Sequence, residues 1–202
     1  MRPVTILYTM RGSRYEELDG VECYDVERDA RTWDGGTPVV THPPCRFFSF
    51  MAWFAGARYD PDYVFEEIMM GVGSVGLVRL WGGLLEQPEH SNLFKVCDLP
   101  RPGDRPDEWG GYTISVEQCR WGHKALKKTW LYIVGVDPSD LPPIPEWREP
   151  THVINMGNRR NYPNRLPECS KRYRHQTPLE FAEWLVEAAR RTTTTIAGRR
   201  FV

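Results

Sequence analysis

The sequence lacks a long apolar run and an excess of either charge, and each absence excludes a class of protein. No stretch approaches the about 20 apolar residues that a membrane-spanning helix requires, and the first residues, MRPVTILYTMRG, do not resemble a signal peptide. Lysine and arginine number 26 against 27 acidic residues, for a net charge of −1. We therefore expect a cytosolic protein with no membrane partner, in which any attraction to a polyanion is local.

Paired cysteine motifs are also absent. The five cysteines are odd in number and widely separated, and none belongs to a C-x-x-C pair. This pattern argues against a disulfide framework and a zinc knuckle, so free thiols and no bound metal are expected. A metal site made of His42, Cys45, Cys119 and His123 is a minor alternative, because the residue types suit zinc but the spacing does not.

Six short apolar stretches are predicted to be β-strands, and several are continuous runs typical of strands buried on both faces. With 202 residues and 41% apolar composition, the chain is large enough for one compact core. The prediction is a single α/β domain over residues 1–202, with a Rossmann-like, mostly parallel sheet flanked by helices. The expected strands are residues 4–8, 21–25, 38–42, 83–87, 112–116 and 129–135.

Two helices are indicated by their start signals. Asp60-Pro61 suits an N-cap and first turn, and apolar residues then recur at helical intervals. In TPLEFAEWLVEAARR (177–191), Thr177 and Glu180 fit a capping box, and arginines close the end. Residues 136–176, rich in proline and then in basic residues, are predicted to be a loop-rich insertion before this C-terminal helix.

The stretch GVGSVG (71–76) matches the G-x-G-x-x-G fingerprint of dinucleotide-binding proteins. That fingerprint requires a strand before it and a helix after it. Here a helical pattern comes first. We therefore interpret the glycines as positions of close packing in a buried helix and expect no dinucleotide site.

Cys45 directly follows two prolines at the end of a predicted strand, in THPPCR. Such a strand presents its next residue beyond the carboxyl edge of the sheet, where open α/β sheets bind ligands. Arg46 is expected to lower the pKa of the thiol, as a nucleophile requires. The alternative is an ordinary buried cysteine.

Two further segments are expected at the same edge. GGLLEQP delivers Glu86 from a short apolar strand, so a thiol and a carboxylate are predicted to share a cleft. EQCRWGHKALKKTW brings basic side chains toward them, although a solvated basic turn is the alternative for most of these. The basic side chains are Arg120, His123, Lys124, Lys127 and Lys128.

The order of these motifs resembles that of DNA cytosine-C5 methyltransferases, in which Pro-Pro-Cys, Glu-Asn-Val and Gly-x-Pro-Gln-x-Arg-x-Arg follow one another. The chain is more similar still to small, mostly phage-encoded relatives with His-Pro-Pro-Cys, Leu-Glu-x-Pro and Trp-Gly-His-x-x-x-Lys-x-Thr-Trp-Leu signatures. The resemblance covers about residues 38–135 and extends to SKRYRHQTPLEFAEWL. It implies a compact, truncated methyltransferase-like fold in a phage or prophage protein that acts in the bacterial host.

The resemblance also implies the roles of three side chains. Cys45 would attack C6 of a flipped-out pyrimidine, Glu86 would engage the N3 edge of the ring, and Lys127 would steady the adduct. Attack at C6 makes C5 nucleophilic toward an electrophilic carbon. The implied activity is one-carbon transfer, in the first place of methyl, to pyrimidine C5 in DNA.

The implied cofactor is S-adenosylmethionine, but the glycine-rich turn that holds it in the family has no counterpart here. YTMRGSRYEELDG follows the first strand instead. Asp25 or Glu27 would then receive the ribose, and Asp29 or Asp34 the adenine amine. The residues expected to contact DNA are Arg46, Arg120, His123, Arg159, Arg160, Lys171 and Arg172, with a merely solvated basic loop as the alternative for those after residue 154.

Two functions of different classes follow from these observations. The first is a DNA-modifying enzyme, favoured by the intact Cys45 and Glu86 pair. The second is a catalytically inactive module of the same fold that binds DNA or a host restriction or modification protein. The missing glycine turn favours the second.

Overall fold

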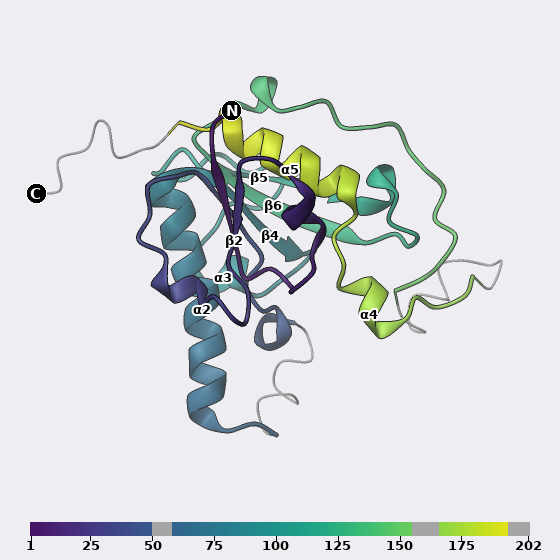
Figure 1. Cartoon of the computed structure of the whole chain (residues 1–202), viewed down its shortest axis with the longest axis horizontal. Coiled ribbons are helices and arrows are strands. Elements are labelled where there is room, and N and C mark those ends of the chain that lie inside the picture. Colours follow the sequence, from purple (N-terminus) through teal and green to yellow (C-terminus); the bar gives the residue numbers. More distant parts are fainter. Residues whose placement is uncertain (50–57, 155–165, 194–202) are drawn as a thin grey trace, which may run out of the picture.

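The computed structural model describes residues 1–49, 58–154 and 166–193, which form an α/β architecture around one six-stranded sheet (Figure 1). The order of the strands in the sheet is β2-β1-β3-β4-β6-β5. All six predicted strands are confirmed, with ends that differ by two residues at most. They are β1 (Val4–Leu7), β2 (Val21–Cys23), β3 (Val39–Thr41), β4 (Gly83–Pro88), β5 (Tyr112–Glu117) and β6 (Lys128–Val134).

The sheet is parallel in one part and antiparallel in the other. β1 pairs in parallel with β2 and β3, and β3 pairs in parallel with β4. β6 lies between β4 and β5 and is antiparallel to both. The expected parallel sheet is therefore confirmed for the first four strands only. β5 and β6 are joined by the short segment 118–127, and a parallel crossover needs about a dozen residues or more.

One long helix covers each face of the sheet. Side chains alternate along a strand, so neighbouring residues enter opposite cores. Ile6, Val40 and Leu84 belong to the cluster that packs against α5 (Leu179–Arg191). The residues beside them on the same strands, Leu7, Val39 and Leu85, belong to the cluster that includes Val75 and Val78 of α2 (Pro61–Trp81).

Short helical turns fill the connections. They are η1 (Arg14–Glu17), η2 (Ala30–Thr32), η3 (Arg46–Phe48), α3 (Leu93–Val96), η4 (Gln118–Trp121), η5 (Pro138–Asp140) and α4 (Lys171–Arg174). The expected loop-rich character of 136–176 agrees with the described part of that stretch, where η5 and α4 are the only helices.

The start signal of α2 is confirmed, whereas that of α5 is wrong. The Asp60 side chain accepts a hydrogen bond from the backbone N–H of Asp62 at 2.9 Å, and α2 then extends to Trp81. At α5 the N-cap is Pro178, and no cap hydrogen bond from a side chain is found there in the described chain. The capping box fails because Glu180 forms an ion pair with Arg148 at 2.7 Å.

The glycines of GVGSVG lie inside α2, and one of them has the predicted packing role. A Cβ atom at Gly71 would come within 2.5 Å of the Phe48 ring. Added Cβ atoms at Gly73 and Gly76 would meet nothing within 4 Å among the described residues. Close packing therefore explains Gly71 alone.

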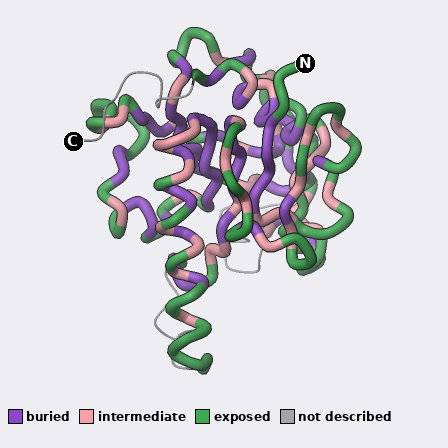
Figure 2. Tube along the Cα trace, turned by 60° about the vertical axis from the view of Figure 1, so that its left-hand side comes forward, coloured by how far each residue is buried: buried purple, intermediate pink, exposed green. Residues whose placement is uncertain are grey.

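The first half of α2 extends beyond the body of the molecule (Figures 1 and 2). Figure 2 shows it as largely exposed, and Phe65 and Met69 are among the exposed apolar side chains. No helix within the described residues is long and apolar enough to cross a membrane.

The strand order places a switch point next to β1. The chain passes from β1 to β2 on one side and then returns to β3 on the other side. The loops that leave the carboxyl ends of β1 and β3 therefore diverge, and a crevice opens between them.

Candidate active site

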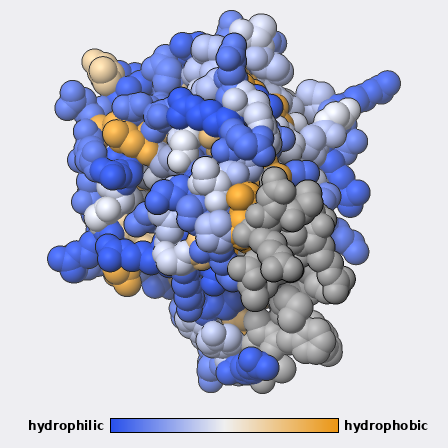
Figure 3. All heavy atoms as spheres, turned by 90° about the vertical axis from the view of Figure 1, so that its right-hand side faces the viewer, coloured by the Kyte–Doolittle hydropathy of each residue, from blue (hydrophilic) through white to orange (hydrophobic). Residues whose placement is uncertain are grey.

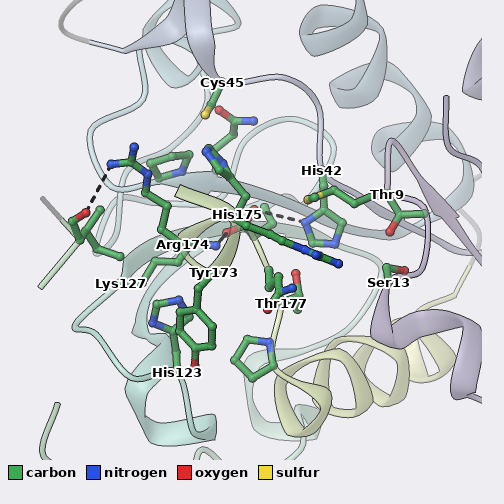
Figure 4. Close-up of a pocket in the computed structure, with 18 of the residues that line it drawn as sticks. Thr9, Ser13, His42, Cys45, His123, Lys127, Tyr173, Arg174, His175 and Thr177 are labelled. Atoms are coloured by element: carbon green, nitrogen blue, oxygen red, sulfur yellow. Dashed lines mark hydrogen bonds and ion pairs between the residues drawn. The ribbon is translucent and has the colours of Figure 1, made fainter. Parts of the chain in front are cut away.

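A large pocket lies at this carboxyl edge, with a volume of about 1560 Å³. Its walls come from segments far apart in the sequence, and Figure 4 shows side chains from both sides, including His42, Cys45, Lys127 and His175. The lining residues are 8–14 after β1, 42–46 and 49 after β3, 59 before α2 and 67 within it, 86–89 at the end of β4, 121–123 and 126–128 around the start of β6, 152–154, and 171–180 around α4.

The pocket brings together seven of the predicted site residues. Glu86 comes from β4, Cys45 follows the neighbouring strand β3, and Lys127 precedes the other neighbour, β6. Because β6 is antiparallel, its first residues lie at the same edge as the last residues of β3 and β4. The residues brought together are Cys45, Arg46, Glu86, His123, Lys127, Lys171 and Arg172.

Cys45 is half-buried at the start of η3, and its thiol is not activated in the way that was predicted. Burial and the negative charge of Glu86 raise its pKa, and Lys127 offsets this only in part. Arg46 is not among the charges that lower it, and its guanidinium binds the Tyr63 hydroxyl at 2.9 Å and the Glu67 carboxylate at 3.5 Å. The predicted lowering of the thiol pKa by Arg46 is therefore wrong, and the thiol is protonated at neutral pH.

Glu86 is 9% exposed and is held by several donors. The Gln118 amide donates to Oε1 at 3.0 Å, and Nδ1 of His42 lies 3.2 Å from Oε2. Burial would raise the pKa of this carboxyl, but the charge of Lys127 and the hydrogen bonds from His42 and Thr129 outweigh burial and lower the pKa to about 2. Glu86 is thus an ionised hydrogen-bond acceptor.

His42 links Glu86 to the core. Its Nε2 lies 2.8 Å from the hydroxyl of Tyr15, which is buried in η1. If Nδ1–H donates to Glu86, Nε2 accepts from Tyr15, so the two contacts require one tautomer. Sequence reasoning considered His42 only as a metal ligand and missed Tyr15, Gln118 and Thr129. The position of His42 at the end of the strand beside β4 was the available signal.

The two consecutive lysines before β6 point to different partners. Nζ of Lys127 lies 3.9 Å from Oε1 of Glu86, whereas Lys128 pairs with Glu89 at 3.7 Å. Arg120 does not line the pocket, contrary to its expected place at the DNA site. It pairs with Glu117 at 3.0 Å instead, and its guanidinium covers the ring of Trp147.

His123 is 3% exposed and has one nitrogen without a partner among the described residues. Its Nδ1 lies 3.0 Å from the backbone nitrogen and 2.9 Å from the backbone oxygen of Ala125, so Nδ1 is engaged by that residue in either tautomer. Burial lowers the pKa of His123 to about 4, and the ring is neutral at pH 7. Nε2 is therefore a buried polar atom beside the pocket that has no hydrogen-bond partner among the described residues.

The acids expected to hold S-adenosylmethionine do not fit that role. Asp25 accepts the backbone N–H groups of Glu27 and Arg28, and Asp29 caps η2 and pairs with Arg31 at 2.6 Å. Asp34 is exposed, and neither it nor the other two acids lines the pocket. Arg159 and Arg160 lie outside the described residues.

The proposed metal site is wrong. The described residues contain no group of three or more His, Cys, Asp or Glu side chains that would hold a metal ion. His42 is engaged by Tyr15 and Glu86, and Cys119 is buried away from the pocket. All five cysteines are free thiols, as predicted.

Positive charge is concentrated in the pocket, although the chain as a whole is nearly neutral. Lysines and arginines in its walls are twice as numerous as glutamates. Burial and the nearby charges of Arg174, Lys127 and Lys171 lower the pKa of His175. The lining cations are Arg11, Arg14, Arg46, Lys127, Lys128, Lys171, Arg172 and Arg174, and the lining acids are Glu67, Glu86, Glu89 and Glu180.

The face of the molecule that carries α4 is largely hydrophilic (Figure 3).

A comparison with models of known protein families and a search of curated proteins give no match for this chain.

Proposed function

We propose that the protein modifies pyrimidine C5 in DNA by transfer of one carbon, in the first place methyl, through a covalent bond between Cys45 and ring C6. The fold proposed with this activity is a truncated, Rossmann-like methyltransferase domain. The observation that carries the proposal is the convergence of Cys45, Glu86 and Lys127 on one pocket from three adjacent strands. The excess of cations in the same pocket supports a polyanionic substrate.

The chemistry assigns a separate task to each group. The thiol of Cys45 gives its proton to solvent water, its sulfur bonds to C6, and the electrons of the C5–C6 double bond become available at C5. C5 then bonds to the donor carbon as the leaving group of the donor departs. Transfer of the C5 proton to solvent water restores the double bond and expels the sulfur as thiolate.

Glu86 acts as an acceptor toward the base, because it is ionised. It would hold a cytosine by the N4 amine or a uracil-type ring by N3–H, and His42 and Gln118 fix its direction. Lys127 would offset the negative charge that develops on the ring during attack. No step is assigned to S-adenosylmethionine, since Asp25, Asp29 and Asp34 do not line the pocket.

The test is covalent trapping on DNA that contains a 5-fluoropyrimidine, which blocks the loss of the C5 substituent after transfer. We expect a protein–DNA adduct in the presence of a one-carbon donor and none with Cys45→Ser, since a hydroxyl is a far weaker acid and a far weaker nucleophile than a thiol. Cys119→Ser is the matched control and should trap like the wild type. Adduct formation by Cys45→Ser would overturn the assignment of the nucleophile.

The alternative is a module that binds DNA or a host restriction or modification protein without turnover. It is supported by the raised pKa of Cys45 and by the position of Asp25, Asp29 and Asp34 outside the pocket. It predicts a non-covalent DNA complex and no adduct with any donor. Calorimetric titration with S-adenosylmethionine separates the two possibilities further. Micromolar binding would support methyl transfer, whereas no binding at millimolar concentration would favour another donor or the binding module.

A further inference from the structure

Aromatic rings gather at the rim of the pocket beside Cys45. The ring of Tyr59 stacks on that of Tyr63, with their centroids 5.6 Å apart, and Phe47 meets Tyr59 edge-on at 5.7 Å. The guanidinium of Arg46 lies 5.0 Å from the centre of the Tyr59 ring. We call these four side chains the Tyr59 platform. Two of its members, Arg46 and Tyr59, line the pocket directly.

The platform is exposed and yet held in place. Tyr59 is 43% exposed and Tyr63 39% exposed, which is unusual for rings that do not cover a core. The Tyr63 hydroxyl donates to the buried Glu67 and accepts from Arg46, and Arg46 lies 3.5 Å from the same carboxylate. Glu67 therefore fixes both Arg46 and Tyr63, so little freedom is lost when a ligand stacks there.

The platform is next to the nucleophile in the chain and in space. Arg46 and Phe47 are the first two residues of η3, and Cys45 is its N-cap. A molecule that reaches Cys45 from this side therefore passes the exposed rings. Elsewhere the pocket is lined by Lys171 and Arg172 of α4, for which no ion pair is found among the described residues.

We propose that the Tyr59 platform stacks an unpaired base next to the one that enters the pocket, so that the substrate is single-stranded DNA. This inference rests on the proposed function. A base within a duplex has neighbours on both faces and offers no free face to a protein ring, whereas an unpaired base does. Exposed aromatic rings beside a cationic groove are the combination by which proteins bind single strands.

The charges agree with this substrate. The cations of α4 would receive the phosphates of the strand, while the rings of the Tyr59 platform receive a base. A single strand can bend to place a phosphate and a base on different walls of one pocket, which a stiff duplex cannot do without deformation.

The experiment measures the Kd of a fluorescent 12-nucleotide single strand and of the same sequence as a duplex, with the Cys45→Ser protein so that no chemistry intervenes. We expect tighter binding of the single strand. Tyr59→Leu keeps an apolar side chain but removes the ring, and it should weaken single-strand binding about ten-fold. Tyr59→Phe keeps the ring and should bind like the parent. Tyr59 precedes the N-cap of α2, so these changes leave the helix intact.

The outcomes separate this inference from the proposed function. Equal or tighter binding of the duplex, or equal binding by the Leu and Phe variants, would overturn single-strand stacking even if trapping on 5-fluoropyrimidine DNA succeeds. Ring-dependent binding of the single strand without any adduct in the trapping experiment would leave the platform in place and remove the enzyme assignment.

Discussion

Nδ1 of His42 lies 3.2 Å from Oε2 of Glu86, and the other nitrogen of the ring lies 2.8 Å from the Tyr15 hydroxyl. A buried tyrosine thereby sets the direction of a carboxylate at the edge of the sheet. The arrangement joins η1, the end of β3 and β4, which are distant in sequence. Glu86 is therefore ionised and oriented before any ligand arrives. Its titration can be measured through the pH dependence of the stability of the folded protein.

In the Glu86→Gln variant, the free energy of unfolding should fall less between pH 5 and pH 2 than it does in the wild type. The pKa of Glu86 is lowered from 4.5 to about 2 in the folded protein, so the unfolded chain binds the proton more tightly. Its contribution to stability is present above pH 4.5 and is lost as the pH falls toward 2, by about 3 kcal/mol in all. Urea denaturation at a series of pH values measures the difference between the wild type and Glu86→Gln.

Glu89→Gln is the matched control, because it removes a more exposed carboxyl from the end of the same strand. Parallel profiles for the wild type and Glu86→Gln between pH 5 and pH 2 would contradict the ionised, hydrogen-bonded state of Glu86.

Removing Lys171 and Arg172 should weaken DNA binding and reduce its dependence on salt. Each bound phosphate releases counterions, so the log–log slope of affinity against salt should fall by roughly one unit for each phosphate that the variant no longer binds. Binding titrations at several salt concentrations give the slope for the Lys171→Ala/Arg172→Ala variant. Lys95→Ala/Arg101→Ala removes two exposed charges that do not line the pocket and should leave the slope unchanged.

An unchanged slope in the Lys171→Ala/Arg172→Ala variant would assign these side chains to the solvated surface. The double substitution tests phosphate binding only, so it remains informative whether or not Cys45 forms an adduct.

Gly71 and Gly73 of α2 should respond in opposite directions to a single added methyl group. A Cβ at Gly71 would come within 2.5 Å of Phe48, which belongs to η3 directly after Cys45. We expect Gly71→Ala to cost about 1–3 kcal/mol of unfolding free energy and to slow trapping by displacing the nucleophile. Gly73→Ala meets open space among the described residues and should stabilise the helix by about 0.5–1 kcal/mol.

Chemical denaturation and trapping rates measured on both alanine variants decide the matter. Equal behaviour of the two variants would show that Phe48 moves aside without cost.

The strands and the Cys45–Glu86 pair could be predicted because both follow from local patterns. Apolar, β-branched runs predict strands, and residues that directly follow parallel strands share one edge. Tyr15 could not be predicted as a partner of His42, because a short turn rather than a periodic element brings it there. The direction of β6 was also missed, since an apolar run has no direction and the short connection at 118–127 was the only signal.

The error at Arg46 has a different origin. Proximity in sequence placed its charge beside Cys45, but Tyr63 and Glu67 of α2 bind the guanidinium and turn it away from the thiol. Such a competition between partners depends on tertiary contacts that no local pattern encodes. The same contacts are what place an arginine in the Tyr59 platform.

The position of α5 in the chain has a consequence for synthesis. This helix covers Ile6, Val40 and Leu84, which leave the ribosome long before residues 179–191 are made. Until then one face of the nascent sheet is open to water and to chaperones. A nonsense mutation upstream of Leu179 would remove the helix that covers this face of the sheet, so such chains are expected to be degraded rather than to persist as shorter active forms.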